Sequence, residues 1–317
     1  DVVIMGHKIT DIDTFGAAIG IFRAARSVGK KAYILIDSNS HSITPYLNMF
    51  LENRDYESDM FINHHMADEL VDDNTVLVVV DTNRPSNTEY PELLERAKNI
   101  VVLDHHRQSS EIIRNATLSY TEPYASSACE MVAEILQYFN EGVKLTRIEA
   151  DCVYAGIIVD TNNFLAKTGI RTFEAAAYLR RCGADVTRVR KIMRNDVSAY
   201  KARAEAIQNA ELYHECYAIG ILPSKNLDMP TIIGAQASNE LLNIIGVKAS
   251  FVLTDYNNII YISARSIDEV NVQIIMERLG GGGHMNIAGA QLAGITAEEA
   301  KTKLKETLDA MIAEGAI

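Results

Sequence analysis

The first stretch of the chain places ligand-type residues directly after a short apolar run. Val2–Met5 is too short for a helix and is followed by Gly6, so we expect a buried strand. Carboxylates repel each other unless a cation lies between them, so the loop after this strand suits a metal ion. Helix capping by an aspartate, with the histidine as an ordinary loop residue, explains the same residues equally well. The residues concerned are His7, Asp11 and Asp13.

Three further elements, two buried strands and a helix, also end on residues that can bind a cation. In an open α/β sheet the carboxyl ends of the strands lie at one edge, where ligands bind. Residues that come after different strands can therefore meet at that edge. They are Asp81 after the apolar run 76–80, Asp104, His105 and His106 after the run 100–103, and Asp160 after a helix predicted over 147–159.

These positions together offer the charge and the ligands for two divalent cations. Four aspartates carry four negative charges, which two such cations neutralise, and two imidazoles add ligands without charge. Two metals about 3.5–4 Å apart share a bridging carboxylate, activate a water and clamp the oxygens of a phosphoryl displacement. Ligation without thiolate suits Mn²⁺ better than structural zinc, with Co, Fe and Mg as alternatives. The predicted metal ligands are His7, Asp11, Asp13, Asp81, His105 and Asp160.

The elements that must position these residues alternate between strands and helices up to about residue 183. Apolar spacing over 15–25 predicts a helix ended by Gly29, and 31–36 predicts a strand. This alternation is typical of a doubly wound, mostly parallel sheet, and the fold class expected is α/β. Further helices are predicted from 44 onward, over 93–98, after capping-box patterns at 127–130 and 146–149, and over 171–182.

The chain changes character near residue 185. Residues 185–213 are charged and helical in pattern without a strand signal, and the remaining residues up to 317 predict a smaller α+β domain. Its expected elements are a strand at 217–222, a helix near 239–245, a hairpin of 248–255 and 259–265, and a helix over 297–313. The predicted divisions are therefore a domain with the candidate metal ligands at 1–185, a helical connector at 186–213, and an α+β domain at 214–317.

Composition narrows the classes of ligand. The 317 residues are 48% hydrophobic, and the net charge of −12 disfavours broad binding to duplex nucleic acid or to an anionic membrane. A small phosphorylated ligand is compatible with that charge. The four cysteines form no Cys-x-x-Cys, which favours a reducing compartment. The sequence shows neither a membrane-length apolar run nor a signal peptide, and because it starts on a strand we expect a fragment of a longer protein.

The sequence resembles a known family through four motifs in order. They are Met-Gly-His-x-x-x-Asp-x-Asp at 5–13, Val-Asp-Thr at 80–82, Asp-His-His at 104–106 and Val-Asp-Thr at 159–161. They resemble the motifs of the DHH phosphoesterase superfamily, and the glycine run before His284 resembles that of its associated carboxyl-terminal domain. Segments 16–20, 123–127, 200–205 and 280–284 most resemble the GdpP-type cyclic-di-AMP phosphodiesterases.

The resemblance implies a function and a division of roles. Two Mn²⁺ ions per chain would be held by His7, Asp11 and Asp81, and by Asp13, Asp81, His105 and Asp160, with Asp81 bridging. A metal-bridging hydroxide would then convert cyclic-di-AMP to linear pApA. His106 would donate a hydrogen bond to the developing charge or protonate the leaving oxygen, and Asp104 would orient a histidine. Asn83 departs from the resemblance, because a histidine is common there in this subfamily.

The carboxyl-terminal domain carries the expected substrate contacts. Glycines allow backbone amides to approach a phosphate closely, and Arg265 can reach a phosphate or stack on a base. A flexible turn at a helix end and a surface salt bridge are the structural alternatives. The candidate substrate-binding residues are Arg265, Gly281, Gly282, Gly283 and His284.

Several alternatives stay open. An oligoribonuclease or pAp phosphatase would use the same metal motifs, and a non-catalytic cyclic-dinucleotide-binding module would use them without turnover. A manganese pyrophosphatase and a processive exonuclease fit less well. The resemblance implies a cytoplasmic position in a membrane-tethered protein, without membrane contact by this fragment, and its members often form homodimers. His64-His65 imitates the Asp-His-His pair and is expected outside the site, at a loop or helix start, and His41 is expected to be exposed.

Overall fold

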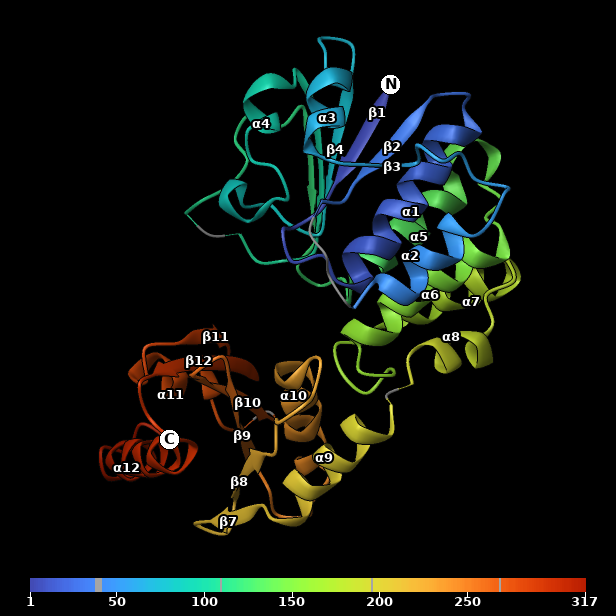
Figure 1. The fold of residues 1–317 in the computed structure, drawn as a ribbon. Coiled ribbons are helices and arrows are strands. Elements are labelled where there is room, and N and C mark those ends of the chain that lie inside the picture. Colours follow the sequence, from blue (N-terminus) through green and yellow to red (C-terminus); the bar gives the residue numbers. More distant parts are fainter. Residues whose placement is uncertain (38–41, 109, 195, 268) are drawn as a thin grey trace. The chain divides into compact units, whose positions relative to one another are not determined.

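The computed structural model describes residues 1–37, 42–108, 110–194, 196–267 and 269–317 (Figure 1). His41 lies outside these residues. The chain divides into two compact units, Asp1–Arg194 and Asn195–Ile317. None of the helices in the described ranges combines the length and the apolar character needed to cross a bilayer.

The first unit contains a six-stranded sheet in which every neighbouring pair is parallel, in the order β3-β2-β1-β4-β5-β6. The strand order reverses beside β1, so the ends of β1 and β4 form the switch point where ligands bind in such folds. The predicted strands are confirmed, whereas β3 and β6 were not predicted. The strands are β1 Val2–Met5, β2 Ala32–Leu35, β3 Phe61–Ile62, β4 Val76–Val80, β5 Asn99–Asp104 and β6 Leu118–Thr121.

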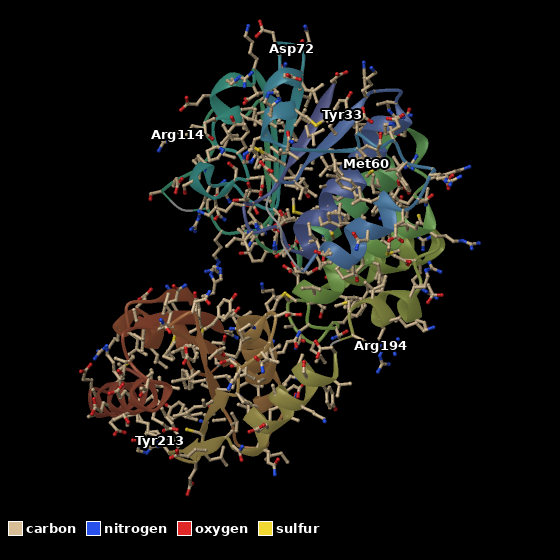
Figure 2. The ribbon with its side chains drawn as sticks, viewed as in Figure 1. Tyr33, Met60, Asp72, Arg114, Arg194 and Tyr213 are labelled. Atoms are coloured by element: carbon tan, nitrogen blue, oxygen red, sulfur yellow. The ribbon has the colours of Figure 1, made fainter. Side chains whose placement is uncertain are left out.

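Helices cover both faces of this sheet, which confirms the doubly wound class. Along β1, Ile4 packs into one apolar core and Val3 into the other, because successive side chains point to opposite faces. Met60 and Tyr33, labelled in Figure 2, likewise belong to different cores. The core that contains Ile4 includes α1 Ile12–Ser27, α2 Thr44–Leu51, α5 Ala128–Tyr138, α6 Arg147–Asp160, α7 Ile170–Arg181 and α8 Val186–Ile192, and the other includes α3 His64–Leu70 and α4 Leu93–Arg96.

Two glycines allow α1, α5 and α6 to approach one another closely near the site. A Cβ atom on Gly16 would lie 2.6 Å from the carbonyl oxygen of Cys152. A Cβ atom on Gly156 would lie 2.4 Å from Cys129 Sγ and 2.9 Å from Asp13 Oδ1. Any larger residue would therefore push these helices apart and displace Asp13.

Helix starts agree with the capping patterns, with one correction. Thr146 and Glu149 form the reciprocal capping box of α6. At α5, Ser127 accepts a hydrogen bond from the backbone of Glu130, but the Glu130 carboxylate bonds to Ser126 instead of reaching back to Ser127. The predicted capping box is therefore only half present. Two short 3₁₀ helices, Pro85–Asn87 and Phe139–Glu141, complete the unit.

The second unit is a six-stranded mixed sheet packed with helices, which agrees with the predicted α+β class. Its strand order is β11-β12-β10-β9-β8-β7, with β8 and β9 parallel and the other pairs antiparallel. The elements are α9 Val197–Gln208, β7 Glu211–Tyr213, β8 Tyr217–Leu222, α10 Pro230–Leu241, β9 Ala249–Tyr256, β10 Ile259–Ser266, α11 Val272–Arg278, β11 Gly282–His284, β12 Ile287–Ala293 and α12 Ala297–Ala313.

Two local predictions in this unit are wrong and one is confirmed. The helix expected near 239–245 begins earlier, at Pro230, and ends at Leu241. Residues 242–245 lead into Gly246, whose φ of 91° is not helical. The stretch 185–213 ends in a strand, β7, although its pattern gave no strand signal. The hairpin is confirmed, with Asn257 and Asn258 both at positive φ in its turn. The three-part domain division stays a prediction, and α8 and α9 belong to different compact units.

Candidate metal centre

The structure brings all six predicted metal ligands together at the carboxyl edge of the first sheet. His7 follows β1, Asp81 follows β4 and His105 follows β5. Asp11 and Asp13 come from the start of α1, and Asp160 is the last residue of α6. Contacts between these side chains then form one continuous chain, with Asp81 at its centre.

Asp81 faces two different histidines with its two oxygens. Oδ2 lies 3.4 Å from His7 Nε2, and Oδ1 lies 3.3 Å from His105 Nε2. The carboxylate is 2% exposed, and Thr14 Oγ1 donates a 2.6 Å hydrogen bond to Oδ2. Its backbone has φ 61°, a left-handed conformation that aspartate tolerates better than most residues. This is the arrangement that a bridging carboxylate requires.

The group on one side of Asp81 consists of His7 and Asp11. His7 Nε2 lies 3.6 Å from Asp11 Oδ2, and one ligand atom from each of the three residues lies within 4.8 Å of the others. Asp11 Oδ1 meanwhile accepts a 2.9 Å hydrogen bond from Thr14 N as the N-cap of α1. Asp11 therefore caps the helix through Oδ1 and faces His7 through Oδ2.

The group on the other side of Asp81 is centred on His105. Its Nε2 lies 3.8 Å from Asp13 Oδ2 and 3.4 Å from Asp160 Oδ2. Three-residue groups of ligand spacing form twice here, as Asp13–His105–Asp160 and as Asp81–His105–His106. The four residues predicted on this side thus fall into two groups that share His105, and the group with Asp81 also includes His106.

Asp13 is fixed by the amino end of α5. Ala128 N donates to Asp13 Oδ2 at 2.7 Å, and Cys129 N donates to Oδ1 at 2.9 Å. A helix N-terminus stabilises negative charge, so these two amides hold the buried carboxylate in place. Sequence patterns predicted the helix start but gave no signal that its amides would meet a residue about 115 positions earlier.

The electrostatics of the group favour bound cations. Burial lowers the pKa of His7, but the adjacent carboxylates of Asp11 and Asp81 outweigh it and raise the pKa to about 10. Burial also opposes protonation of His105, and Asp81, Asp13 and Asp160 together raise its pKa to about 10. Protons on both imidazoles therefore offset part of the carboxylate charge in the protein without metal. A divalent cation would displace those protons when it binds.

Two buried polar atoms also fit metal ligation. Asp81 Oδ1 and His105 Nε2 lie 3.3 Å apart, but neither atom makes a well-aligned hydrogen bond with any described residue, although both are enclosed. Leaving a buried polar atom unpaired costs about 1–3 kcal/mol, and a cation between the two atoms would remove that cost. Carboxylate and imidazole ligands without thiolate suit Mn²⁺ and similar ions. The residues present therefore fit a metal pair.

His106 and Asp104 form a pair beside this centre. Asp104 is fully buried, and its Oδ1 accepts a 3.1 Å hydrogen bond from His106 N and lies 2.8 Å from His106 Nδ1. His106 Nδ1 also lies 3.6 Å from Asp81 Oδ1, while nearly half of the side chain is exposed. Asp104 thus orients His106, and the ring stands at the open side of the ligand group.

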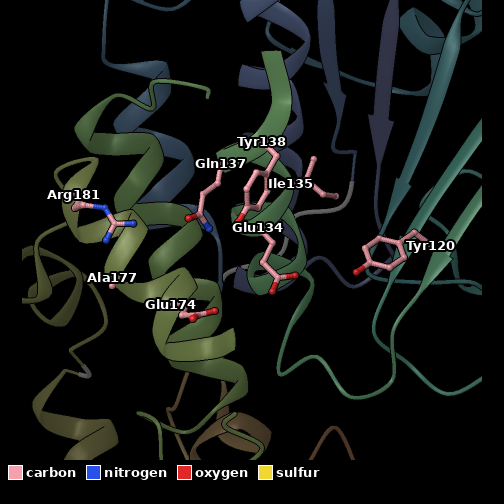
Figure 3. Close-up of a pocket in the computed structure, with 8 residues that line it drawn as sticks. All are labelled: Tyr120, Glu134, Ile135, Gln137, Tyr138, Glu174, Ala177 and Arg181. Atoms are coloured by element: carbon pink, nitrogen blue, oxygen red, sulfur yellow. The ribbon is translucent and has the colours of Figure 1, made fainter. Parts of the chain in front are cut away.

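The pocket in Figure 3 lies elsewhere in the first unit. It has a volume of about 570 Å³ and lies between α5 and α7, with Tyr120 on a third side. None of the six predicted metal ligands lines it. The pocket is therefore separate from the metal centre.

Comparison with known proteins decides the family. Residues 1–157 match the DHH family, N-terminal domain, and residues 218–314 match the DHHA1 domain. This chain belongs to the DHH family. It is 44% identical over 313 residues to the cyclic-di-AMP phosphodiesterase GdpP of Bacillus subtilis, covering 98% of this chain and 47% of that protein. It is 38% identical to the cyclic-di-AMP phosphodiesterase PdeA of Listeria monocytogenes, covering 98% and 47%. The chain spans about half the length of these curated relatives.

A more distant sequence relative and one solved structure also match nearly the whole chain. The bifunctional oligoribonuclease and PAP phosphatase NrnA of Thermus thermophilus is 26% identical, covering 97% of this chain and 89% of that protein. The crystal structure of an exopolyphosphatase-related protein from Bacteroides fragilis superposes with a TM-score of 0.82 at 20% identity, covering 98% of this chain and 92% of that one. This likeness agrees with a DHH-type fold for the whole chain.

The glycine run of the DHHA1 unit differs from the structural alternative of a flexible turn. Gly280, at φ 80°, ends α11, and the next residues form the edge strand β11, paired with β12. A Cβ atom on Gly281 would lie 2.1 Å from Gly289 O, and one on Gly283 would lie 2.5 Å from Ile287 O. Close packing against β12 therefore explains these two glycines, and the run is an ordered strand rather than a flexible turn. Gly282 has open space on its Cβ side.

Arg265 and His284 lie on the two strands that flank β12 in the sheet of the second unit. Arg265 lies on β10, opposite Ile287 of β12, and His284 lies on β11 opposite the same residue. Burial lowers the pKa of Arg265 to about 10. Its Nη1 donates to the Ala264 carbonyl at 2.9 Å, whereas its Nε has no hydrogen-bond partner in the described part of the chain. The structural alternative, a surface salt bridge of Arg265, does not occur with any of the described residues.

Proposed function

We propose that this chain hydrolyses cyclic-di-AMP to linear pApA with two Mn²⁺ ions. The observation that carries the proposal is the central position of Asp81, whose two oxygens face His7 and His105 at 3.4 and 3.3 Å. The names of relatives at 38–44% identity over nearly the whole chain supply the substrate. The NrnA-type relatives are more distant, which makes oligoribonucleotide or pAp hydrolysis the second candidate.

The proposed ligands of one ion are His7, Asp11 and Asp81, and those of the other are Asp13, Asp81, His105 and Asp160. Bound there, the ions supply positive charge and a water activated for attack on phosphorus. The water oxygen forms a bond to phosphorus and one ring P–O3′ bond breaks. The freed 3′ oxygen takes up a proton, so cyclic-di-AMP and one water give pApA.

His106 is the proposed catalytic residue of this chain. Its Nδ1 is engaged by Asp104, so Nε2 is the nitrogen left for a substrate oxygen. A hydrogen bond from Nε2 would stabilise charge on the phosphate, and a proton from it would serve the leaving oxygen. Asp104 holds the ring and does not need to touch the substrate.

The DHHA1 unit is proposed to hold the nucleotide. Arg265 supports this role because a buried guanidinium with an unpartnered Nε is costly unless a ligand pairs with it. The backbone of β11, at the edge of the sheet, presents one side without a neighbouring strand in the described ranges. We include Gly281, Gly282, Gly283 and His284 in the proposed substrate contacts.

We also infer the setting in which the chain works. Four cysteines without disulfides support a reducing compartment, and therefore a cytoplasmic position for this part of the protein. Tethering of the longer protein to a membrane and pairing of two copies remain part of this proposal. Sedimentation of the purified chain at micromolar concentration tests the pairing, because a homodimer doubles the mass of 35.1 kDa.

Chromatography of the products tests the function. Cyclic-di-AMP, pApA, pAp and short oligoribonucleotides are incubated separately with the protein and Mn²⁺. We expect cyclic-di-AMP to disappear fastest and pApA to accumulate. Faster loss of pAp or of oligoribonucleotides would favour the NrnA-type activity. Binding of cyclic-di-AMP without turnover in the presence of Mn²⁺ would make the chain a binding module.

A further inference from the structure

Asn83 lies buried between the metal centre and the Asp104–His106 pair. Asn83 follows Asp81 by two positions in the sequence, and the residue is 4% exposed. Asn83 Nδ2 donates one hydrogen bond to Asp104 Oδ2 and another, of 3.3 Å, to the carbonyl oxygen of His106. Its own backbone carbonyl accepts a 2.9 Å hydrogen bond from Ile113 N. The side-chain amide is thus held through Nδ2, and the backbone of the residue is held through its carbonyl.

Charge decides which end of the amide faces Asp104. A reversed amide would place Oδ1 against a carboxylate oxygen, and two acceptors repel each other. Oδ1 itself has no hydrogen-bond partner among the described residues. Donation from Nδ2 to Asp104 is therefore the contribution that this side chain makes.

The two oxygens of Asp104 are divided between two neighbours. Asn83 occupies Oδ2, and the backbone N and ring Nδ1 of His106 share Oδ1. Because the carboxylate is fully buried, losing the Asn83 donor would leave Oδ2 unpaired and free the group to rotate towards other donors. Such a rotation would release His106 Nδ1.

We propose that Asn83 is a positioning residue that acts on the reaction through Asp104. It holds the carboxylate so that His106 keeps Nδ1 turned inward and presents Nε2 to the phosphodiester. The proposal rests on the proposed function, because His106 matters only when a phosphodiester is the substrate. An amide is a suitable donor for this task, since it cannot lose its proton to Asp104 as an imidazole could.

A double-mutant cycle tests whether Asn83 acts through His106. The variants are Asn83→Leu, His106→Ala and the double variant, assayed with Mn²⁺ on cyclic-di-AMP and on bis(p-nitrophenyl) phosphate. We expect Asn83→Leu to lower kcat about 10–100-fold with little change in KM and with unchanged Mn²⁺ content. In the His106→Ala background the same substitution should change kcat less than about twofold.

Additive losses in the cycle would overturn the proposal, because a merely structural role of Asn83 would not depend on His106. Asn83→Ala repeats the test if the leucine variant does not fold. Asn83→His, which restores a ring N–H donor, should recover most of the lost kcat. Failure of that rescue, with metal content and melting temperature like those of the parent, would also count against the role.

A measurement without turnover separates this proposal from the proposed function. Histidine labelled with ¹⁵N, in protein loaded with diamagnetic Mg²⁺, reports which ring nitrogen of His106 carries the proton. We expect a single Nδ1-protonated form in the parent and a mixture of forms in Asn83→Leu. Identical spectra would overturn the positioning role even if cyclic-di-AMP is hydrolysed. A shift towards the mixture would support that role even if cyclic-di-AMP is not the substrate.

Discussion

Two histidine pairs follow strands of the same parallel sheet, and their surroundings differ. His105-His106 follows β5, and His105 Nε2 alone lies within 3.8 Å of three carboxylates, those of Asp81, Asp160 and Asp13. His64-His65 follows β3, and His64 divides its contacts between two nitrogens, with Nδ1 3.1 Å from Asp37 and Nε2 3.8 Å from Glu89. Three carboxylates thus lie near a single nitrogen of His105, whereas each ring nitrogen of His64 faces a different carboxylate.

The difference arises from the position of each strand in the sheet. β5 lies beside β4, and β4 beside β1, so the residues after three strands share the neighbourhood of the switch point. β3 is an edge strand, separated from β1 by β2. The His64 ring also stacks on Tyr90, with ring centroids 4.3 Å apart, and this contact fixes the orientation of the ring. The same dipeptide therefore lies at the predicted metal centre in one place and at a helix start in the other.

The largest expected effect is that of Asp81→Asn. One oxygen becomes an amide NH₂, which faces a histidine and cannot bind a cation, so one of the two groups loses its shared ligand. We expect turnover to fall about 10³-fold or more while the fold persists. Hydrolysis of cyclic-di-AMP and circular dichroism measure the two properties. Near-parental turnover would contradict the central position of Asp81.

The histidine pairs themselves can be compared directly. We expect His105→Ala to lower turnover about 100-fold or more and to reduce the Mn²⁺ content, because a ligand nitrogen shared by two groups is removed. His64→Ala is the matched control at the equivalent place after β3, and we expect turnover within about twofold of the parent. Elemental analysis and the hydrolysis assay check both variants. Equal losses would remove the distinction between the pairs.

A substitution in the DHHA1 unit should separate substrate binding from metal binding. We expect His284→Ala to raise KM for cyclic-di-AMP about threefold to tenfold, the loss of about one hydrogen bond, with the Mn²⁺ content unchanged. The Gly281→Ala variant is unsuitable here, because a Cβ would meet Gly289 O. Metal lost together with His284 would contradict the proposed division of roles.

Bound metal should stabilise the fold through the first pair and not through the second. At a free Mn²⁺ concentration 100 times the Kd, each site adds about 2.7 kcal/mol to the free energy of unfolding. We expect Mn²⁺ to raise the melting temperature of the parent and of His64→Ala equally, and that of His105→Ala less. Thermal scans with Mn²⁺ and with EDTA provide the comparison. An equal rise in all three would place the metal elsewhere.

The smallest expected effect concerns pH in the metal-free protein. The pKa of His105 is raised from its ordinary 6.5 to about 10, so its protonated form stabilises the folded state. That contribution is fully present below pH 6.5 and is lost as the pH rises through 10. We expect the melting temperature in EDTA to fall over this range, and less steeply in His105→Ala than in His64→Ala. Parallel slopes in the two variants would contradict the shifted pKa.

The six predicted metal ligands could be picked out from the sequence because each of them lies next to the end of a recognisable strand or at one end of a recognisable helix. Val76–Val80 is a continuous apolar run of four valines and one leucine, and such runs locate buried strands well. β3 has only two residues, and β6 is largely exposed, so neither left a comparable signal. His105 and His64 differ in the position of the strand that precedes each of them in the sheet. The family motifs indicated this difference, whereas the His-His dipeptides themselves did not.

Contacts between distant segments were beyond sequence reasoning. Asp13 is held by amides of Ala128 and Cys129, and Asn83 meets Asp104 across 21 positions. No local pattern records such pairings, because they depend on how three helices and two strand ends pack. The glycine run shows the same limit of local patterns, since its packing partner β12 lies beyond a turn.

The most direct test is the stoichiometry of bound Mn²⁺ in the parent and in Asp81→Asn, measured by equilibrium dialysis and elemental analysis. We predict two ions per chain in the parent and no more than one in the variant, because Asp81 is the carboxylate whose oxygens face both histidine groups. Fewer than two ions in the saturated parent, or the same two in the variant, would contradict a metal pair bridged by Asp81.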